Sequence, residues 1–265
     1  MPSCRIGAVS YLNSKPLIAE LDRLAEGATV TVDLPSRLAE ALSKGLLDVA
    51  LIPSIEYFRA SGYTVVSDAC VACEGPVRSV KLYSRVPIGE IRSLALDEGS
   101  RTSAALTKIL LDQKFGLQPR FETLPIGAMP NECDTDAVLL IGDRAMRPVE
   151  GTFDTVWDLG QQWTDWTGLP FVFAMWVARP GVDSQWLGKV LGTARDAGIE
   201  KLEEIAQREA PIVGISEASC LSYLRDHLTF HLGIRQRKGL MRFYELAQKR
   251  GLAPEGVDFI AGETV

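Results

Sequence analysis

Short apolar runs and helix-like segments follow one another along the first third of the chain. The runs are rich in Val, Ile and Leu, as in buried strands, and span residues 6–9, 30–33, 49–52, 64–66 and 77–83. Between them, residues 17–24, 36–44 and 54–60 repeat apolar side chains at helical spacing. Strands that alternate with helices are typical of βαβ units, so the pattern predicts an α/β fold.

A second α/β series follows a break in the pattern at residues 84–89. It begins with a strand at Ser93–Leu96 and a helix from about Arg101 to Lys114, and further strands lie near Phe121, Val138 and Phe171. A long helical stretch at residues 184–209 comes after another break at residues 178–181. We interpret the two breaks as domain crossings, which predicts one domain of residues 1–86 plus 180–265 and a second of residues 87–179.

Composition and charge narrow the class of protein. The chain has 265 residues, 46% of them hydrophobic, and a formal net charge of -6 without a basic stripe or tail, which disfavours nucleic-acid binding. No apolar segment approaches the roughly 20 residues of a membrane helix. Residues 1–5 lack the basic and apolar regions of a signal peptide. We expect a cytoplasmic protein with no nucleic-acid or membrane partner, and the sequence leaves its oligomeric state undefined.

The cysteines and histidines have the spacing of metal or redox sites, but their surroundings favour simpler roles. Cys70 and Cys73 form one CxxC motif in an apolar run, without the second pair of a zinc site. Five cysteines in a chain of this size fit reduced thiols. His227 and His231 are spaced i, i+4, but no acidic third ligand accompanies them. We expect buried thiols, an amphipathic helix that carries both histidines, and no metal.

The polar segment after the first predicted strand is a candidate binding site. Residues 10–17 follow the apolar run 6–9 and begin a helical segment. Ligands of open α/β sheets collect outside the carboxyl ends of strands, where helix N-termini offer free N–H groups to anions. Asn13 is therefore a candidate for binding or catalysis. The alternative is that Ser10 and Asn13 only form a turn and a helix cap.

Three other polar positions invite the same two interpretations. Residues 97–103 form a strand–loop–helix junction rich in hydroxyls, which is suited to hold a carboxylate or only to cap its own helix. Ser79 is one polar residue in an apolar strand, where it faces either a ligand or solvent. Asp143 follows a predicted strand and either holds a substrate hydroxyl or caps a turn.

Several aromatic side chains are candidates for the wall of a cleft that binds a flat ring. Phe171 and Phe173 lie on the same face of a predicted strand, whereas Trp176 lies on the other face. We expect one of the two phenylalanines to lie near the ligand. Most of the remaining aromatic side chains are expected to pack in the core or between domains, and these are Tyr11, Trp163, Trp166 and Trp176.

Six short stretches carry a resemblance to a known family. They are residues 9–17 (VSYLNSKPL), 47–54 (LDVALIPS), 75–80 (GPVRSV), 100–103 (SRTS), 141–143 (IGD) and 167–174 (TGLPFVFA). In this order they resemble the chorismate dehydratases, which open the futalosine route to menaquinone. The resemblance spans nearly the whole chain and implies the two-domain fold of type 2 periplasmic binding proteins, with the substrate in the cleft between the domains.

The resemblance also implies a reaction and a set of residues. The substrate would be chorismate, which loses water to give 3-(1-carboxyvinyloxy)benzoate without a metal or organic cofactor. The implied catalytic residues are Asn13 and Ser79. The implied substrate-binding residues are Ser10, Tyr11, Ser54, Ser100, Arg101, Thr102, Ser103, Asp143, Phe171 and Phe173.

The chemistry of these residues suggests how the proton leaves the substrate. Amides and hydroxyls such as those of Asn13 and Ser79 are not useful bases at neutral pH. Our hypothesis is an E1cB elimination in which the substrate's own enolpyruvyl carboxylate removes the ring proton. Asp143 or Glu56 is a competing base, and helix N-termini with Arg101 or Lys15 would balance the charge of the substrate.

Two other functions remain as alternatives. The first is the lyase of the same pathway that releases 1,4-dihydroxy-6-naphthoate, although residues 9–17 do not match its N-terminal signature. The second is a non-catalytic solute-binding protein of a transporter, which shares the hinged fold but is normally exported.

Overall fold

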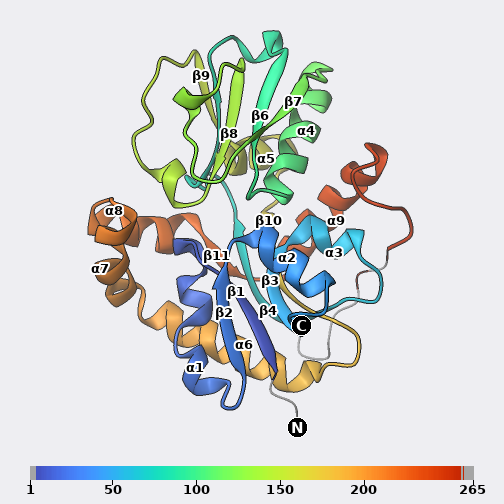
Figure 1. The fold of residues 1–265 in the computed structure, drawn as a ribbon, viewed down its shortest axis with the longest axis vertical. Helices are drawn as coiled ribbons and strands as arrows, with labels where there is room; N and C mark the ends of the chain where they lie inside the picture. The colour runs from blue at the N-terminus through green and yellow to red at the C-terminus, as the bar shows by residue number, and fades with distance from the viewer. Residues whose placement is uncertain (1–3, 258, 260–265) are drawn as a thin grey trace.

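The computed structural model describes residues 4–257 and 259, which form two α/β halves, each with its own sheet (Figure 1). The first sheet has the order β11-β4-β10-β3-β1-β2 and the second has the order β7-β6-β8-β5-β9. The strands of the first sheet are β1 (Arg5–Val9), β2 (Thr29–Asp33), β3 (Val49–Pro53), β4 (Thr64–Cys73), β10 (Phe171–Ala178) and β11 (Thr229–His231). Those of the second are β5 (Val80–Ser84), β6 (Ser93–Asp97), β7 (Arg120–Leu124), β8 (Ala137–Ile141) and β9 (Thr155–Asp158).

Helices surround both sheets. In the first half they are η1 (Leu12–Ile18), α1 (Leu21–Leu24), α2 (Pro35–Ser43), α3 (Ser54–Arg59), α6 (Ser184–Glu200), α7 (Leu202–Val213), α8 (Glu217–Ser222), the π-turn η5 (Tyr223–His227) and α9 (Ile234–Lys249). In the second half they are η2 (Ile88–Glu90), α4 (Thr102–Phe115), η3 (Pro130–Glu132), η4 (Asp143–Met146) and α5 (Leu159–Thr167). Within the described residues, no helix has the length and apolar character needed to cross a membrane.

Parallel strands bring the carboxyl ends of each sheet to one edge. β1 lies between β2 and β3 in parallel, and β6 lies between β7 and β8 in parallel. The antiparallel strand β10 joins β3 to β4, and β5 joins β8 to β9. Every residue of β3, β8 and β10 is buried, as expected for central strands covered on both faces. The segments that follow β1, β3, β6 and β8 therefore face the space between the two halves.

The sequence predicted most of these elements, and the differences have local causes. The predicted helix 17–24 is split into η1 and α1, because Pro16 lies within the short η1 and Glu20 adopts a left-handed conformation between the two. The predicted stretch 184–209 is two helices, α6 and α7, which meet at Lys201. The prediction that one amphipathic helix carries both histidines is wrong, since His227 ends the π-turn and His231 lies in β11.

Sheet membership differs from the domain boundaries that the sequence suggested. Residues 80–84 pair in the second sheet, and residues 171–178 pair in the first sheet. The chain therefore crosses between sheets at residues 74–79 and 159–170, before the expected positions at 86 and 180. Both crossings contain Gly and Pro, at Gly75-Pro76 and at Gly168-Leu169-Pro170. The breaks chosen from the pattern are instead the loops after β5 and β10.

Candidate active site

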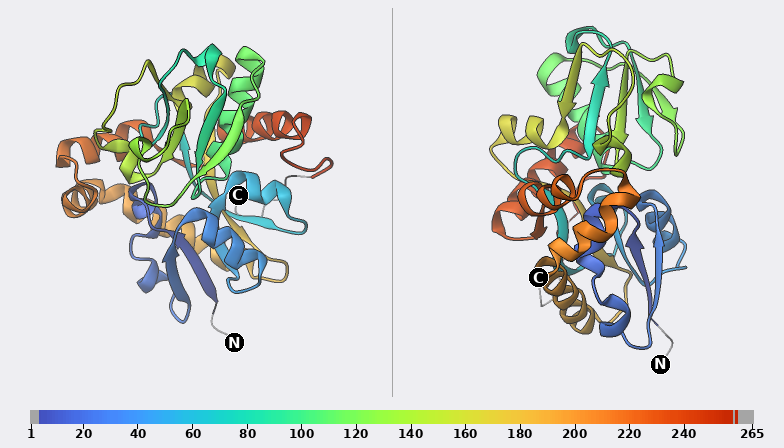
Figure 2. Two further views of the ribbon diagram at one scale, coloured as in Figure 1. Left: turned by 45° about the horizontal axis from the view of Figure 1, so that its top comes forward. Right: turned by 90° about the vertical axis from the view of Figure 1, so that its left-hand side faces the viewer.

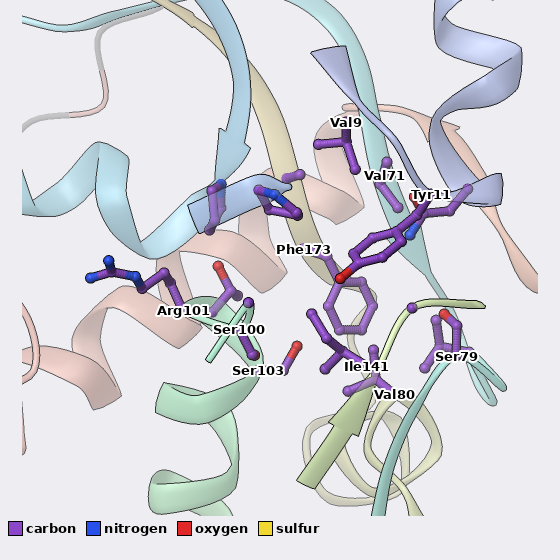
Figure 3. Close-up of a pocket in the computed structure, with 18 residues that line it drawn as sticks. Val9, Tyr11, Val71, Ser79, Val80, Ser100, Arg101, Ser103, Ile141 and Phe173 are labelled. Carbon is purple, nitrogen blue, oxygen red and sulfur yellow. The ribbon is translucent and has the colours of Figure 1, made fainter. Parts of the chain in front are cut away.

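A cavity of about 550 Å³, including its open mouth, lies between the two halves. Part of its wall comes from the carboxyl ends of β1, β3 and β8, at Val9, Pro53 and Ile141, which is the position at which open α/β sheets bind ligands. Its polar lining consists of Tyr11, Asn13, Ser79, Ser100, Arg101, Thr102 and Ser103. Its apolar lining consists of Val9, Pro35, Pro53, Val71, Val77, Val80, Ile141, Phe173 and Ala174. Figure 3 shows Ser79 and Arg101 at opposite ends, with the rings of Tyr11 and Phe173 between them.

Asn13 reaches the cavity because the chain turns directly after β1. Ser14 fixes this turn, since its buried hydroxyl donates to the carbonyl oxygens of Val9 and Tyr11. The side chain of Asn13 faces inward, and its Oδ1 is buried without a hydrogen-bond partner among the residues that the structure describes. A buried acceptor without a partner costs about 1–3 kcal/mol. A ligand that donates a hydrogen bond to this oxygen would remove that cost.

Ser79 lies in the crossing segment just before β5, and not inside a strand as the sequence predicted. The carboxylate of Asp158 shapes this segment by accepting from the backbone N–H groups of Val77 and Arg78, at 2.9 and 2.6 Å. Arg78 is in the left-handed region, with φ of 63°. This turn directs the buried Ser79 hydroxyl toward Tyr223, whose hydroxyl donates to Ser79 Oγ at 2.8 Å.

The hydroxyls at the start of α4 have different surroundings, and one of them caps its own helix, which is one of the roles considered from the sequence. Ser100 Oγ accepts from the N–H of Ala104 at 3.2 Å, which is a capping contact. Thr102 Oγ1 accepts from the N–H of Ile55 at 3.2 Å and so connects the two halves. Ser103 is buried and lines the cavity. The first turn of α4 also leaves N–H groups without intrahelical acceptors, which suits a carboxylate.

Contacts of Tyr11 and Asp143 join the two halves beside the cavity. Asp143 Oδ1 accepts from the N–H of Leu12 at 3.0 Å. Gly142 has φ of 73°, and a Cβ there would lie 2.7–2.9 Å from the ring of Tyr11. Burial raises the pKa of Asp143 above its usual value, and the Leu12 N–H opposes that rise. Asp143 thus caps the turn that holds Asn13, which is one of the two roles expected for it.

Four residues expected to bind substrate do not line the cavity. Ser10 lies in the chain that leaves β1, and its N–H donates to the carbonyl of Asp33. Ser54 donates to the carbonyl of Val172 at 2.7 Å. Asp143 makes the contact described above. Phe171 is fully buried behind Phe173, with the two rings edge to face at 4.7 Å. Phe173 is therefore the phenylalanine that faces the ligand space.

The structure adds residues that the sequence did not single out. The apolar walls come from ends of strands, and their alternation gave no sign of which ends would meet. Gly142 had a detectable signal, because a glycine between a strand and Asp143 is typical of a left-handed turn. No sequence signal identified Tyr223, since it is far from Ser79 and Asn13 in the sequence and approaches both only through the fold.

The cavity is nearly free of ionisable groups. Among the described residues that line it, none is Asp, Glu, His, Lys or Cys, and Arg101 is the one cation. Burial raises the pKa of Tyr11, and the nearby charge of Asp97 adds to the rise, so the phenol is a neutral hydrogen-bond donor near pH 7. Lys15, considered as an anion-binding residue, pairs instead with Glu209 at 3.5 Å. Arg101 is exposed at the cavity mouth.

The cysteines and histidines lie outside this cavity. Cys70 and Cys73 are buried in β4, and burial raises the pKa of both thiols. His227 Nδ1 lies 3.0 Å from the carbonyl of Pro76, and His231 Nδ1 lies 3.0 Å from Asp68 Oδ2. Within residues 4–257 and 259, no three His, Cys, Asp or Glu side chains gather as a set of metal ligands.

Comparisons of sequence connect the chain with characterised enzymes. Residues 4–249 match a family model described as menaquinone biosynthesis. A chorismate dehydratase of Thermus thermophilus is 33% identical over 258 residues, which are 91% of this chain and 93% of that protein. A chorismate dehydratase of Campylobacter jejuni is 25% identical over 257 residues, which are 93% of this chain and 99% of that protein.

Comparisons of structure identify the fold. A protein of Archaeoglobus fulgidus has a TM-score of 0.75 at 14% identity, over 94% of this chain and 98% of that one. The periplasmic aliphatic sulphonate binding protein of Escherichia coli has a TM-score of 0.63 at 16% identity, over 98% of this chain and 91% of that one. The two-domain fold of periplasmic binding proteins, expected from the sequence, is thereby confirmed.

Proposed function

The chain belongs to the menaquinone-biosynthesis family that includes the chorismate dehydratases, and on that basis we propose that it removes water from chorismate. The product is 3-(1-carboxyvinyloxy)benzoate, and the reaction is the entry to the futalosine route, in the cytoplasm. Identity of 33% over 91% of the chain supports this assignment. The cavity supports it as well, because its polar and apolar walls suit a ring that carries two carboxylates.

The two ends of the cavity offer different groups to the two carboxylates of chorismate. At one end, the N–H groups and hydroxyls of the first turn of α4, with Arg101 at the mouth, would hold the ring carboxylate. At the other end, Ser79 and Asn13 would hold the enolpyruvyl carboxylate. Tyr11 and Phe173 lie between these ends and would face the ring (Figure 3).

The neutral lining favours a base that the substrate itself supplies. The ring proton leaves from the carbon that bears the ether oxygen, and the resulting carbanion is delocalised through the ring double bond to the ring carboxylate. Among the described lining residues, none is Asp, Glu or His. The enolpyruvyl carboxylate accepts the proton, hydroxide leaves from the neighbouring carbon, and the ring becomes aromatic. Positioning of this kind can lower the activation free energy by roughly 7–11 kcal/mol.

The two competing bases have other partners. Asp143 accepts from the N–H of Leu12 and does not line the cavity. Glu56 accepts from Arg59 at 2.8 Å and does not line it either. Asn13 suits the proposed transfer, because an amide donates through Nδ2 to a carboxylate and accepts through Oδ1 from a carboxylic acid. The same side chain therefore binds the enolpyruvyl group before and after it takes the proton.

The decisive experiment is to mix the purified protein with chorismate, without added metal or cofactor, and to follow products by chromatography and mass. A product lighter by one water, with the absorbance of an aromatic ring, is the expected result. Chorismate recovered unchanged, together with a raised melting temperature, would instead support a solute-binding protein. If chorismate neither reacts nor stabilises the protein, the release of 1,4-dihydroxy-6-naphthoate is the next activity to test.

A further inference from the structure

Tyr223 lies directly behind the two polar residues at one end of the cavity. It is the first residue of the π-turn η5, its side chain is fully buried, and it is not part of the cavity lining. Its hydroxyl donates to Ser79 Oγ at 2.8 Å, and it also forms a hydrogen bond with the Asn13 side chain. Tyr223 is thus a shared partner of Ser79 and Asn13.

The directions of these hydrogen bonds determine which groups remain for a ligand. A phenol has one proton, and that of Tyr223 is donated to Ser79. The phenol oxygen then accepts from the Asn13 amide nitrogen, since Asn13 Oδ1 has no partner among the described residues. Ser79 keeps its own hydroxyl proton, and Asn13 keeps one N–H and its oxygen. All three groups belong to residues that line the cavity.

The fold places Tyr223 at the junction between the two halves. The segment from α7 to η5, orange in the figures, runs along one side of the junction between the two halves (Figure 1; Figure 2, right). The π-turn follows α8 without a break, and such turns are frequent at functional sites. Burial raises the pKa of the Tyr223 hydroxyl far above its usual value, so the phenol remains protonated near neutral pH.

We propose that Tyr223 is a positioning residue, which holds the Ser79 hydroxyl and the Asn13 amide in the orientation that faces the ligand's carboxylate. This inference rests on the proposed function and deepens it. Without the phenol hydroxyl, Ser79 Oγ loses its donor and the Asn13 amide loses its acceptor, so both side chains can rotate and the enolpyruvyl carboxylate loses aligned donors. The start of α4 still binds the other carboxylate, so turnover falls more than substrate binding does.

Tyr223→Phe tests the inference, because it removes the hydroxyl and keeps the ring. We expect kcat to fall about 10- to 100-fold with KM changed less than threefold. In a double-mutant cycle with Ser79→Ala, Tyr223→Phe should cause a smaller loss than it does in the wild type, because only its effect through Asn13 then remains. Tyr244→Phe is the matched control, since Tyr244 is also buried but bonds the carbonyl of Pro254, and it should keep wild-type kcat.

Unchanged kcat in Tyr223→Phe, or a loss that adds fully to that of Ser79→Ala, would overturn the inference. Crystal structures of the wild type and Tyr223→Phe supply a readout that needs no activity. We expect one Ser79 rotamer in the wild type and a different or mixed rotamer in the variant, whereas the same rotamer in both rejects the positioning role. If the wild type does not dehydrate chorismate, the proposed function fails, and the rotamers still decide whether Tyr223 orients Ser79.

Discussion

At the scale of single residues, the polar side chains at the centre of the cavity are uncharged. Asn13 and Ser79 carry neither a positive charge nor a basic lone pair, and the backbone turns around them are fixed by Ser14 and Asp158. Such groups bind and orient a substrate without a change in their own protonation state near neutral pH. The catalytic effect that we assign to them is therefore one of placement, and it should be lost when either side chain is shortened.

Asn13→Ala is expected to lower kcat by about 10²- to 10³-fold, the typical cost of losing one donor at a reacting group. Affinity for chorismate should change much less, because the ring carboxylate keeps its contacts at α4. Steady-state kinetics and calorimetric titration with the product would separate the two effects. Asn131→Ala, at an exposed asparagine in η3, is the control. Near-normal turnover in Asn13→Ala would refute the template mechanism.

At the scale of elements, the position of Asn13 depends on how closely α6 packs against η1. Gly198 of α6 meets the backbone of Pro16, and a Cβ at Gly198 would lie 1.9 Å from the Pro16 carbonyl oxygen. The atoms in contact belong to the backbone of Pro16, which cannot move away from an added Cβ as the end of a flexible side chain can. A glycine is therefore required in the last turn of α6, although glycine is less favourable than alanine within a helix by about 1 kcal/mol.

Gly198→Ala should reduce the free energy of unfolding by about 3 kcal/mol and also lower kcat, since η1 must shift. Gly192→Ala is a matched control in the same helix, because the nearest atoms to its added Cβ are 3.9 Å away. That variant should be neutral or more stable by up to about 1 kcal/mol. Urea denaturation of both variants measures the difference. Equal stabilities for the two variants would contradict the proposed backbone contact.

Three strand ends of the first sheet meet at Asp48. Its carboxylate accepts from the guanidinium of Arg5 at 2.7 and 3.0 Å and from that of Arg179 at 2.6 Å. These contacts, with Arg5 foremost, hold the pKa of Asp48 well below its usual value of 3.8. Because the unfolded chain binds the proton more readily, this contribution to stability is present above the unfolded pKa and is lost as pH falls through the folded pKa.

Asp48→Asn should therefore flatten the acid side of the stability profile. We expect a loss of about 1 kcal/mol at pH 7, and a smaller difference from the wild type as pH falls below about 4. Urea denaturation between pH 7 and pH 3 is the measurement. Asp22→Asn, at an exposed carboxylate in α1, provides the comparison. A difference from the wild type that stays constant with pH would show that charge pairing is not the cause.

At the scale of the whole molecule, a few polar contacts hold the two halves around the cavity. The N–H of Leu12 donates to Asp143, the N–H of Ile55 donates to Thr102, and Arg250, the C-cap of α9, pairs with Asp112 of α4. Hinged two-domain proteins exclude water from their cleft when such contacts form around a ligand. Asp143 matters most here, because its partner belongs to the turn that carries Asn13.

Asp143→Ala is expected to weaken closure, since the buried N–H of Leu12 loses its acceptor at a cost of about 1–3 kcal/mol. KM should rise about tenfold or more, and small-angle scattering should show a larger radius of gyration. Asp143→Asn keeps an oxygen acceptor and should retain most of the activity. A loss in Asp143→Asn as large as that in Asp143→Ala would assign the carboxylate a direct chemical role.

The sequence predicted strands and turns well where the signal came from neighbouring residues. Strands 6–9 and 49–52 and the strand expected near Val138 are continuous buried runs, and the polar turn after the first one reaches the cavity as expected. Phe171 and Phe173 share a face by alternation, but sequence spacing could not tell which would be covered by Trp163 and Phe243. Ser10 and Asp143 were chosen from their positions at strand ends, and Ser54 was implied by the family resemblance. The Ser10 N–H and the Ser54 hydroxyl donate within the protein, and Asp143 accepts within it.

The sequence by itself determined the α/β class, most strands and helices, and the polar segments that follow β1 and β6. Hydrophobic periodicity, turn residues and helix ends act over a few positions, so they can be recognised without knowing the fold. Only the tertiary structure decided where the chain crosses between sheets, which hydroxyls face the cavity, and that Tyr223 meets Ser79 across 144 positions. Those outcomes depend on how elements far apart in the sequence pack together. Local patterns of residues contain no information about the distances between such elements.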